Sequence, residues 1–375
     1  MYESGGRPID ASRVLFIELP DDSNRRQRLA ATETLVRAAD LGRIIEPKHK
    51  VAIKLHVGER HNDTHVSADL VKPIIALVKR HDALPFLTET STLYKGRRSN
   101  AIDHIIQAFD HGFTYEKTGA PFIMADGLSG NTEIEVPIPG IIFDKVNIAR
   151  EIVFADALIT VSHPTGHPGM GLGAALKNLG MGLSSRIGKL RQHSSVMPYV
   201  DDTACTFCRK CMQWCPVEAI VEKHEKAFIV TETCIGCGEC LSVCNYDAIR
   251  YNWGVQSADL QKRVAEHALG VVQNKSQKCY FFNFLIDMTG GCDCEGSRQK
   301  RIMPDVGILA SSDPVAIDQA TLDLTGRRHG ESLAEKSEPR LNAAIQLEHA
   351  EKIGLGKRSY DLVVIQPAQR PLSLQ

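Results

Sequence analysis

Hydrophobic and polar positions alternate along the chain in a way that predicts strands separated by amphipathic helices. Short runs rich in Val, Ile, Leu and Phe predict strands. These runs cover residues 12–19, 50–57, 84–89, 121–126, 156–163, 279–287, 306–311 and 361–366. Apolar positions at helical spacing predict helices between the strands, among them 67–81, 100–112, 257–274 and 339–354. Such alternation is typical of a mostly parallel, doubly wound sheet with helices on both faces.

Local signals set the limits of several predicted elements. Ser67 is a candidate N-cap for the helix over 67–81, and Pro73 would kink or shorten that helix. Asp313 caps a further predicted helix that has Pro314 at its first position. We read Asp318 in that helix as a solvated or structural residue, and Cys279 as a small buried hydrophobe.

The strongest sequence signal is an internal repeat of cysteines. The segment CTFCRKCMQWCPVEAI, residues 205–220, returns as CIGCGECLSVCNYDAI, residues 234–249. Each copy has the spacing C-x2-C-x2-C-x3-C, and the following Ala-Ile pair recurs as well. Three closely spaced thiolates followed by a fourth are typical of iron–sulfur ligation, whereas zinc sites favour two separate C-x-x-C pairs. A pair of zinc knuckles is the alternative.

The repeat resembles the bacterial two-cluster ferredoxins, in which the fourth cysteine of each motif binds the other cluster. The resemblance assigns one 4Fe–4S cluster to Cys205, Cys208, Cys211 and Cys244, and a second to Cys234, Cys237, Cys240 and Cys215. Asn245 stands where the ferredoxin motif has a proline, as Pro216 does in the first copy. Proline is not a ligand, so this departure leaves the ligand set unchanged.

The repeat interrupts the α/β pattern and therefore divides the chain. We predict an α/β domain whose first segment covers residues 1–200 and whose second segment covers 254–375. A two-cluster ferredoxin module, of α+β type, is inserted between them at 201–253. The large sheet is then built from both ends of the chain.

Composition narrows the class of protein further. Hydrophobic residues make up 43% of the 375 and charged residues 24%, as in ordinary globular proteins. The formal charge of −1 gives no general attraction to nucleic acid or to an anionic membrane. Because the sequence shows no apolar run of about 18 residues and no export signal, we expect a cytoplasmic protein. Its eleven cysteines then serve metal or redox chemistry in a reducing compartment.

Candidate catalytic residues fall where the predicted strands end. Sheets of this kind bind ligands beyond the carboxyl ends of their strands. Polar residues that follow strand ends would therefore meet at one rim: Lys54, His56, Glu89, His163, His167, Cys292 and Cys294. Period-2 alternation places Lys54 and His56 on the same face of their strand.

Each of these candidates has a structural alternative. Lys54 and His56 could lie on an edge strand that faces water. His163 and His167 could shape a loop rich in Pro and Gly, and Glu89 could be a loop carboxylate. The stretch GGCDCEG, residues 290–296, is expected to form an exposed loop in which the cysteines could be plain loop residues.

A glycine-rich stretch, GHPGMGLGAALKNLGMG, places Lys177 and Asn178 near a helix start. Backbone N–H groups at such a place, together with a lysine, would suit a phosphate or a carboxylate. The stretch matches neither glycine motif for nucleotide binding, so no nucleotide is implied. Close packing of glycines against the sheet is the alternative. We take Lys177 and Asn178 as candidates for binding an anionic small molecule.

Several segments together resemble the family called domain of unknown function 362. They are VAIKLHVGE, SHPTGHPGMGLGAALKNLGMG, NFLIDMTGGCDC and PDVGILASSDPVAID, which flank the cysteine repeat. The resemblance covers the chain from about residue 13 to residue 366. It implies an iron–sulfur protein of a prokaryote and leaves the reaction open.

Two functions fit these features. The first is an oxidoreductase, in which two 4Fe–4S clusters pass electrons from a soluble donor to a substrate or to a third metal or redox site at Cys292 and Cys294. The second is a non-catalytic adaptor that delivers electrons, metal or a cluster to a partner enzyme. We favour the reductase, because an adaptor has little use for convergent Lys, His and Glu side chains in a pocket. The sequence does not define the oligomeric state.

Overall fold

The computed structural model describes residues 11–94, 96–193, 198–234, 239–250, 257–275 and 277–366. Its centre is an eight-stranded sheet with the strand order β16-β1-β15-β14-β7-β2-β3-β4. In that order the strands are Tyr360–Val364, Ser12–Glu18, Gly307–Ser311, Cys279–Leu285, Ala157–Ser162, Lys50–Lys54, Leu84–Glu89 and Phe122–Met124. Within this sheet β15 runs antiparallel to both of its neighbours, and the other pairs are parallel. The prediction of an α/β fold with a mostly parallel sheet is therefore confirmed.

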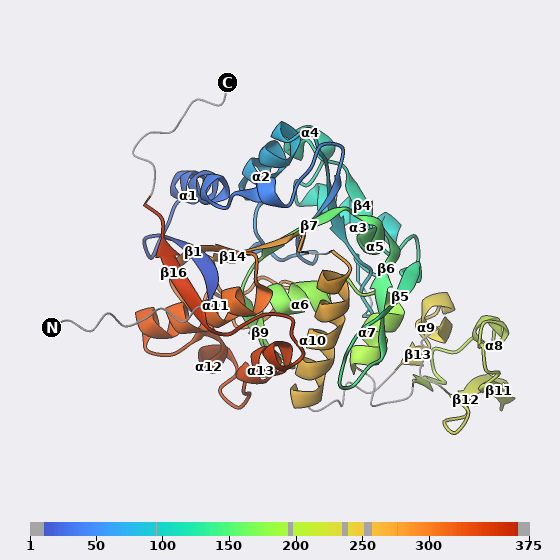
Figure 1. Cartoon of the computed structure of the whole chain (residues 1–375). Helices are drawn as coiled ribbons and strands as arrows, with labels where there is room; N and C mark the ends of the chain where they lie inside the picture. Colours follow the sequence, from blue (N-terminus) through green and yellow to red (C-terminus); the bar gives the residue numbers. More distant parts are fainter. Residues whose placement is uncertain are drawn as a thin grey trace.

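Helices cover both faces of this sheet (Figure 1). One face carries α1 (Arg25–Ala38), α2 (Ala68–Arg80), α3 (Ala101–Asp110) and α4 (Tyr115–Thr118), with the 3-10 helix Leu41–Arg43 beside them. The other face carries α6 (Ala175–Gly180), α10 (Ser257–Gln273), α11 (Pro314–His329), α12 (Leu333–Ser337) and α13 (Ala344–Lys352). Successive strand residues point to opposite faces, so Ala52 joins one hydrophobic core and Ile53 joins the other.

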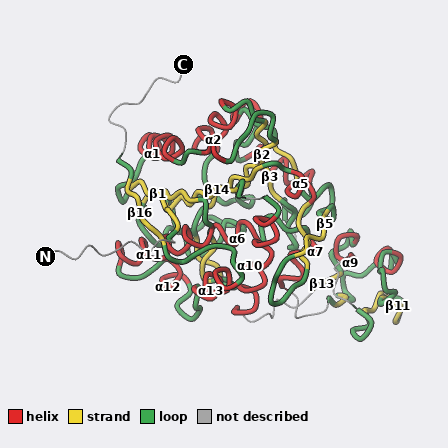
Figure 2. The backbone as a smooth tube through the Cα atoms, in the orientation of Figure 1, coloured by secondary structure: helices red, strands yellow, loops and turns green. Residues whose placement is uncertain are grey.

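Smaller elements surround the sheet, as the tube in Figure 2 shows. The helices α5 and α7 cover Arg150–Phe154 and Arg186–His193. The hairpin of β5 and β6, Glu133–Pro137 and Lys145–Ala149, was not predicted from the sequence, and β8 and β9 cover Thr165–His167 and Gly171–Gly173.

The part of the chain with the cysteine repeat projects from the side of the main body (Figure 1). Its helices are α8 (Lys210–Gln213) and α9 (Glu239–Val243). Its strands are β10 (Tyr199–Val200), β11 (Ile220–Lys223), β12 (Lys226–Ile229) and β13 (Ile249–Arg250), which pair as β10 with β13 and β11 with β12.

Two predictions about helix ends have different outcomes. Pro73 does not shorten its helix, because α2 continues to Arg80 with Leu70, Ile74 and Val78 buried along one side. Ser67 occupies the N-cap position of α2 but makes no capping hydrogen bond with its side chain. Asp313 caps α11 by accepting hydrogen bonds from the backbone of Val315 and Ala316.

The order of the strands creates a crevice at the carboxyl ends of β2 and β7. After β2 the chain continues outward through α2 to β3 and β4, and it then returns to β7 on the other side of β2. The helix α2 lies on one face of the sheet, whereas α6, which follows β7, lies on the other. Connections that leave neighbouring strands toward opposite faces open a crevice where ligands bind. None of the helices in the described ranges is both long and apolar enough to cross a membrane.

Candidate functional site

A cavity of about 510 Å³ lies at this crevice. It is lined by the seven predicted rim residues and the two candidate anion-binding residues: Lys54, His56, Glu89, His163, His167, Cys292 and Cys294, with Lys177 and Asn178. The cavity therefore gathers side chains that follow β2, β3, β7 and β14, together with two residues of α6. Asp287, which also follows β14, instead pairs with Arg28 and Arg301.

Lys54 and Glu89 form a buried ion pair at the base of the cavity. Each is 2% exposed, and the Lys54 Nζ lies 3.6 Å from a Glu89 carboxylate oxygen. Burial lowers the pKa of Lys54 to about 8, although the charge of Glu89 opposes this effect. The strand β2 is an interior strand between β7 and β3, so the alternative of an edge strand facing water is wrong for Lys54.

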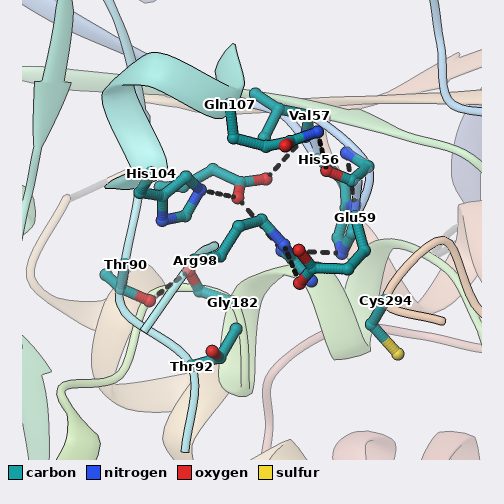
Figure 3. Close-up of polar contacts among 12 residues, drawn as sticks. His56, Val57, Glu59, Thr90, Thr92, Arg98, His104, Gln107, Gly182 and Cys294 are labelled. Atoms are coloured by element: carbon teal, nitrogen blue, oxygen red, sulfur yellow. Dashed lines mark hydrogen bonds and ion pairs between the residues drawn. The ribbon is translucent and has the colours of Figure 1, made fainter. Parts of the chain in front are cut away.

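Arg98 is the largest omission from the predicted site. Its guanidinium lies 3.2 Å from the Glu59 carboxylate (Figure 3). It also lies 3.3 Å from Glu89 and contacts the Tyr94 hydroxyl. It lies 3.1 Å from His56 Nε2. Burial and the Arg98 charge hold the pKa of His56 well below its usual range, so the ring is neutral. Arg98 lies in a loop without periodicity, and its sequence neighbourhood, KGRRSN, carries no recognisable motif.

Glu89 is the shared carboxylate of this network. It accepts hydrogen bonds from the Val57 backbone at 3.0 Å and pairs with His104 at 2.7 Å. Burial disfavours its charged form, yet the charge of Lys54, the neighbouring His56 ring and the contact with His104 hold its pKa well below its usual range. Glu89 is therefore a carboxylate and a structural anchor for the cations around it.

His163 forms a fixed pair with Asp293. Its Nδ1 lies 2.8 Å from the Asp293 carboxylate and its Nε2 lies 2.8 Å from the Ile286 carbonyl oxygen. Both nitrogens therefore donate, and the ring carries a positive charge. Burial opposes that charge, but Asp293 raises the pKa of His163 above its ordinary value. Since its two N–H groups are occupied, His163 positions Asp293 and is not a free proton donor.

His167, unlike His163, is neutral, and its ring lines the same cavity. Its Nδ1 accepts hydrogen bonds from the backbone N–H groups of Gly169 and Met170, both at 3.1 Å. Burial and the nearby charge of Lys177 hold the pKa of His167 well below its usual range. The ring proton must then lie on Nε2, which leaves a neutral N–H donor at the cavity wall.

Cys292 is held as a thiolate. Its Sγ accepts hydrogen bonds from the Lys177 Nζ at 3.0 Å and from the Cys294 backbone N–H at 3.4 Å. A hydrogen bond from the Cys294 thiol lowers the pKa of Cys292, burial opposes this, and the Lys177 charge lowers the pKa further. The same hydrogen bond raises the pKa of Cys294 well above its usual range. The two cysteines therefore form a thiolate and thiol pair.

The expectation of an exposed loop is wrong for Cys292, which is 5% exposed. The Gln299 side chain folds the loop inward, because it accepts from the Gly291 N–H and donates to the Cys292 carbonyl oxygen, both at 2.9 Å. Lys177 then contacts the sulfur from the opposite wall.

The start of α6 does not provide the backbone anion site that the glycine-rich stretch suggested. The N–H groups of Ala175 and Leu176 donate to Asp318 at 2.9 and 2.8 Å. Asp318 is thus a fully buried structural residue of α11. Asn178 accepts a hydrogen bond from Lys54 at 2.8 Å and donates to Ser162 at 3.0 Å. Lys177 is therefore the residue at the start of α6 that places a charge at the cavity.

Lys189 was also missed, because its segment RIGKLRQH carries no motif that distinguishes a solvated basic face from a wall inside the protein. It is 7% exposed and donates to the Ser91 and Ser184 carbonyl oxygens at 2.6 and 3.0 Å. Burial lowers its pKa, opposed by the charge of Asp126. Lys54, Arg98, Lys177 and Lys189 therefore line the cavity against the carboxylates of Glu89 and Asp293.

Seven of the eight cysteines of the repeat lie within the described residues, and Cys237 lies outside them. Burial raises the pKa of Cys211, and the charges of Cys244, Cys208 and Cys205 raise it further. Cys244 therefore lies near the first triplet, although it belongs to the second copy of the repeat.

The recurring Ala-Ile pair has a visible role. The Ala219 N–H donates to Cys215 Sγ at 3.2 Å, and the Ala248 N–H donates to Cys244 Sγ at 3.3 Å. Ile220 and Ile249 are buried in the small core that the cysteines share. The recurring Ala-Ile pair thus has a structural role in both copies of the repeat.

The cysteine segment touches the cavity wall. Leu241 of α9 lies next to Cys240, belongs to the core of the cysteine segment and packs against Leu93 and Leu190. Leu93 also lines the cavity.

Among the described residues, no three His, Cys, Asp or Glu side chains converge to hold one metal ion. This finding concerns only sites that hold a single metal ion, because the four cysteines of a 4Fe–4S cluster each bind a different iron. In the described parts of the chain, Cys292 and Cys294 therefore belong to no such group of three side chains.

The fold and site define an α/β protein with a polar, cation-lined cavity at a topological switch point and a cysteine-rich segment beside it. Residues 51–323 match the family described as Domain of unknown function (DUF362), and the chain belongs to that family. A 79-residue stretch, 21% of this chain, is 34% identical to "Pyruvate synthase subunit PorD" of Methanothermobacter marburgensis and covers 90% of that protein.

Two solved structures match the chain with low sequence identity and TM-scores below 0.5. The lactate racemase apoprotein from Thermoanaerobacterium thermosaccharolyticum is 11% identical with a TM-score of 0.42, over 84% of this chain and 58% of that chain. A protein from Thermotoga maritima is 12% identical with a TM-score of 0.40, over 77% of this chain and 55% of that chain. This chain thus spans less than two thirds of the length of either solved protein.

Proposed function

We propose that this protein is an iron–sulfur oxidoreductase that reduces a small anionic substrate in the cavity. Residues 201–253 would form a two-cluster ferredoxin-type module, with one cluster on Cys205, Cys208, Cys211 and Cys244 and the other on Cys215, Cys234, Cys237 and Cys240. The neighbouring sulfurs around Cys211, the N–H···S bonds and the likeness to a pyruvate synthase subunit support this proposal. When bound, such clusters would supply single electrons from a soluble donor.

The residues of the cavity suit an anion. Lys177 has two further N–H donors besides the one directed at Cys292, and His167 presents a neutral N–H at the same wall. Lys54 and Arg98 are more deeply engaged with Glu89, so they add positive potential and hold the pocket in shape. In this arrangement Lys177 orients the substrate, and the neutral His167 ring offers it a hydrogen bond from its N–H.

The observation that carries the proposal is the contact of Leu241 with Leu93 and Leu190. It joins the cysteine segment to the cavity wall through packed apolar side chains. A free-standing adaptor would have no need for its cysteine segment to pack against a pocket of its own chain. The alternative of an electron or metal adaptor therefore has less support.

The test compares two variants of the cysteine segment. Leu241→Glu places a charge in the contact, whereas Val221→Glu alters a residue of β11 that is 40% exposed. Both proteins, purified without oxygen, should contain about eight iron and eight sulfide per chain. After chemical reduction, small anionic acceptors should reoxidise the wild type and Val221→Glu at similar rates, followed by visible absorbance. They should reoxidise Leu241→Glu at least about tenfold more slowly.

Two results would contradict the proposal. The first is protein that lacks iron and sulfide although it is folded. The second is reoxidation that is equally fast in all three proteins, because electrons would then leave without using the cavity.

A further inference from the structure

The cavity contains a thiolate that the electron-transfer proposal does not by itself require. Cys292 Sγ faces the Lys177 ammonium, and Cys294 is its neighbour with one residue between them. Both sulfurs line an open volume of about 510 Å³, so a small molecule can reach them. Cys279 provides the contrast within the same chain, because it is 2% exposed inside the sheet and burial raises its pKa to about 12.

We propose that Cys292 and Cys294 are a dithiol pair that reduces a small anionic disulfide bound in the cavity. Cys292 is the attacking sulfur and Cys294 is the resolving sulfur. Lys177 is a positioning residue that keeps Cys292 ionised. This inference deepens the proposed function by naming its substrate class, and it rests on that function for the return of the pair to the reduced state.

The exchange balances in atoms and charge. The Cys292 thiolate attacks one sulfur of the substrate disulfide, the substrate S–S bond breaks, and the first substrate thiolate leaves. That thiolate takes the proton of the Cys294 thiol. The Cys294 thiolate then attacks Cys292, releases the second substrate thiolate and closes a Cys292–Cys294 disulfide. Two electrons and one proton restore the thiolate and thiol pair, and the electrons are those of the proposed function.

The assignment of the two roles follows from the neighbours of each sulfur. Lys177 of α6 contacts Cys292 directly, and the other charged or titratable groups near it are Asp293, Glu295 and Tyr94. Cys294 keeps its proton because it donates to Cys292, while Lys177 and Arg98 act on it less strongly. Attack requires a thiolate, so the sulfur bonded by Lys177 reacts first.

The Cys292–Cys294 disulfide also suits the role of a transient intermediate. A disulfide between cysteines separated by one residue closes a small, strained ring. Strained disulfides are the readily reduced ones, in contrast to those that stabilise a fold.

The first arm of the test measures which sulfur is ionised. Cluster-loaded protein receives a short pulse of iodoacetamide at pH 7, and the modified cysteines are identified by peptide mass spectrometry. Cys292 should react first, and Cys279 should remain unmodified. When the labelling is repeated across pH, Lys177→Met should shift the profile of the Cys292 rate upward by about one pH unit, which corresponds to a tenfold change in acidity, while Lys177→Arg should keep most of the wild-type profile. Faster labelling of Cys294, or no effect of Lys177→Met, would overturn the assignment.

The second arm follows the exchange itself. With dithiodiglycolate, Cys294→Ser should accumulate a mixed disulfide on Cys292, whereas the wild type should form the Cys292–Cys294 disulfide without an adduct. The neutral 2-hydroxyethyl disulfide should react more slowly, because it lacks the charge that Lys177 and Arg98 attract. A stable adduct on the wild type, or equal rates for the two disulfides, would contradict the inference. Neither arm needs electrons from the clusters. The dithiol inference can therefore fail while the proposed electron transfer holds, and the electron transfer can fail while the dithiol inference holds.

Discussion

Glu89 illustrates how one buried carboxylate organises the cations of the cavity. It lies 2% exposed among Lys54, Arg98 and His104 and accepts the Val57 backbone N–H. Burying these charges costs more than their attraction returns unless every partner is present. The network therefore specifies where each cation lies and contributes little net stability as a whole.

Removing the charge of Glu89 should be costly for this reason. Glu89→Gln leaves Lys54 without its carboxylate, and we expect the free energy of unfolding to fall by about 3 kcal/mol in denaturant titrations. Glu135→Gln, at the exposed pair with Lys145, should change it by less than about 1 kcal/mol. The pKa of Glu89 is lowered in the folded state, so its contribution is present above its ordinary pKa. It is lost as the pH falls through the lowered value. Equal effects of the two substitutions would contradict the network.

At the scale of elements, the side-chain positions that could be predicted are those tied to strand ends. Lys54, Glu89 and His163 follow apolar runs whose direction the sequence pattern defines, so their convergence could be expected. Arg98 and Lys189 could not be predicted, because a loop arginine and a lysine on a polar helix look the same whether they face water or a cavity. The inward fold of the Cys292 loop depends on Gln299, a residue with no local signal.

The helix α6 carries Lys177, and its position depends on Asp318 of a different element. Asp318→Ala leaves the buried N–H groups of Ala175 and Leu176 without a partner, so the free energy of unfolding should fall by about 2–4 kcal/mol. Burial raises the pKa of Asp318 to about 6 from 3.8. The stability linked to its protonation is therefore complete below pH 3.8 and is lost as the pH rises through about 6.

Two measurements check this prediction. Denaturant titrations of the wild type and Asp318→Ala across that pH range should differ in slope, and the iodoacetamide rate of Cys292 should fall when α6 shifts. Asp313→Ala, which removes the cap of α11, should cost about 1–2 kcal/mol and leave the Cys292 rate unchanged. A pH dependence that persists without Asp318 would show that another group is responsible.

At the scale of the whole molecule, the two parts of the chain differ in what keeps them folded. The large sheet has extensive cores on both faces, whereas the buried core of the cysteine segment consists of Cys205, Cys211, Ile220, Ala227, Ile229, Cys240, Ala248 and Ile249. Cysteine and alanine supply little apolar area, so we expect this segment to depend on bound metal to remain folded.

Removal of iron should therefore unfold the cysteine segment and leave the large sheet folded. We expect chelation under oxidising conditions to make the segment around residues 201–250 sensitive to limited proteolysis, while the fragments of the large sheet stay associated and folded. Mass spectrometry of the cleavage products locates the cuts, and circular dichroism reports the remaining helix. A segment that resists protease without iron would show that its own side chains suffice.

The position of β1 between β15 and β16 has a consequence for synthesis. A chain that grows from its N-terminus makes β1 first and both of its hydrogen-bonded neighbours last. At about 5–20 residues per second, β1 waits on the order of tens of seconds on the ribosome before its partners emerge. The cysteine segment is complete earlier, so the clusters proposed for it could be inserted while the sheet is still open on one side. Closure of the sheet by the last strands would then be the final step of maturation.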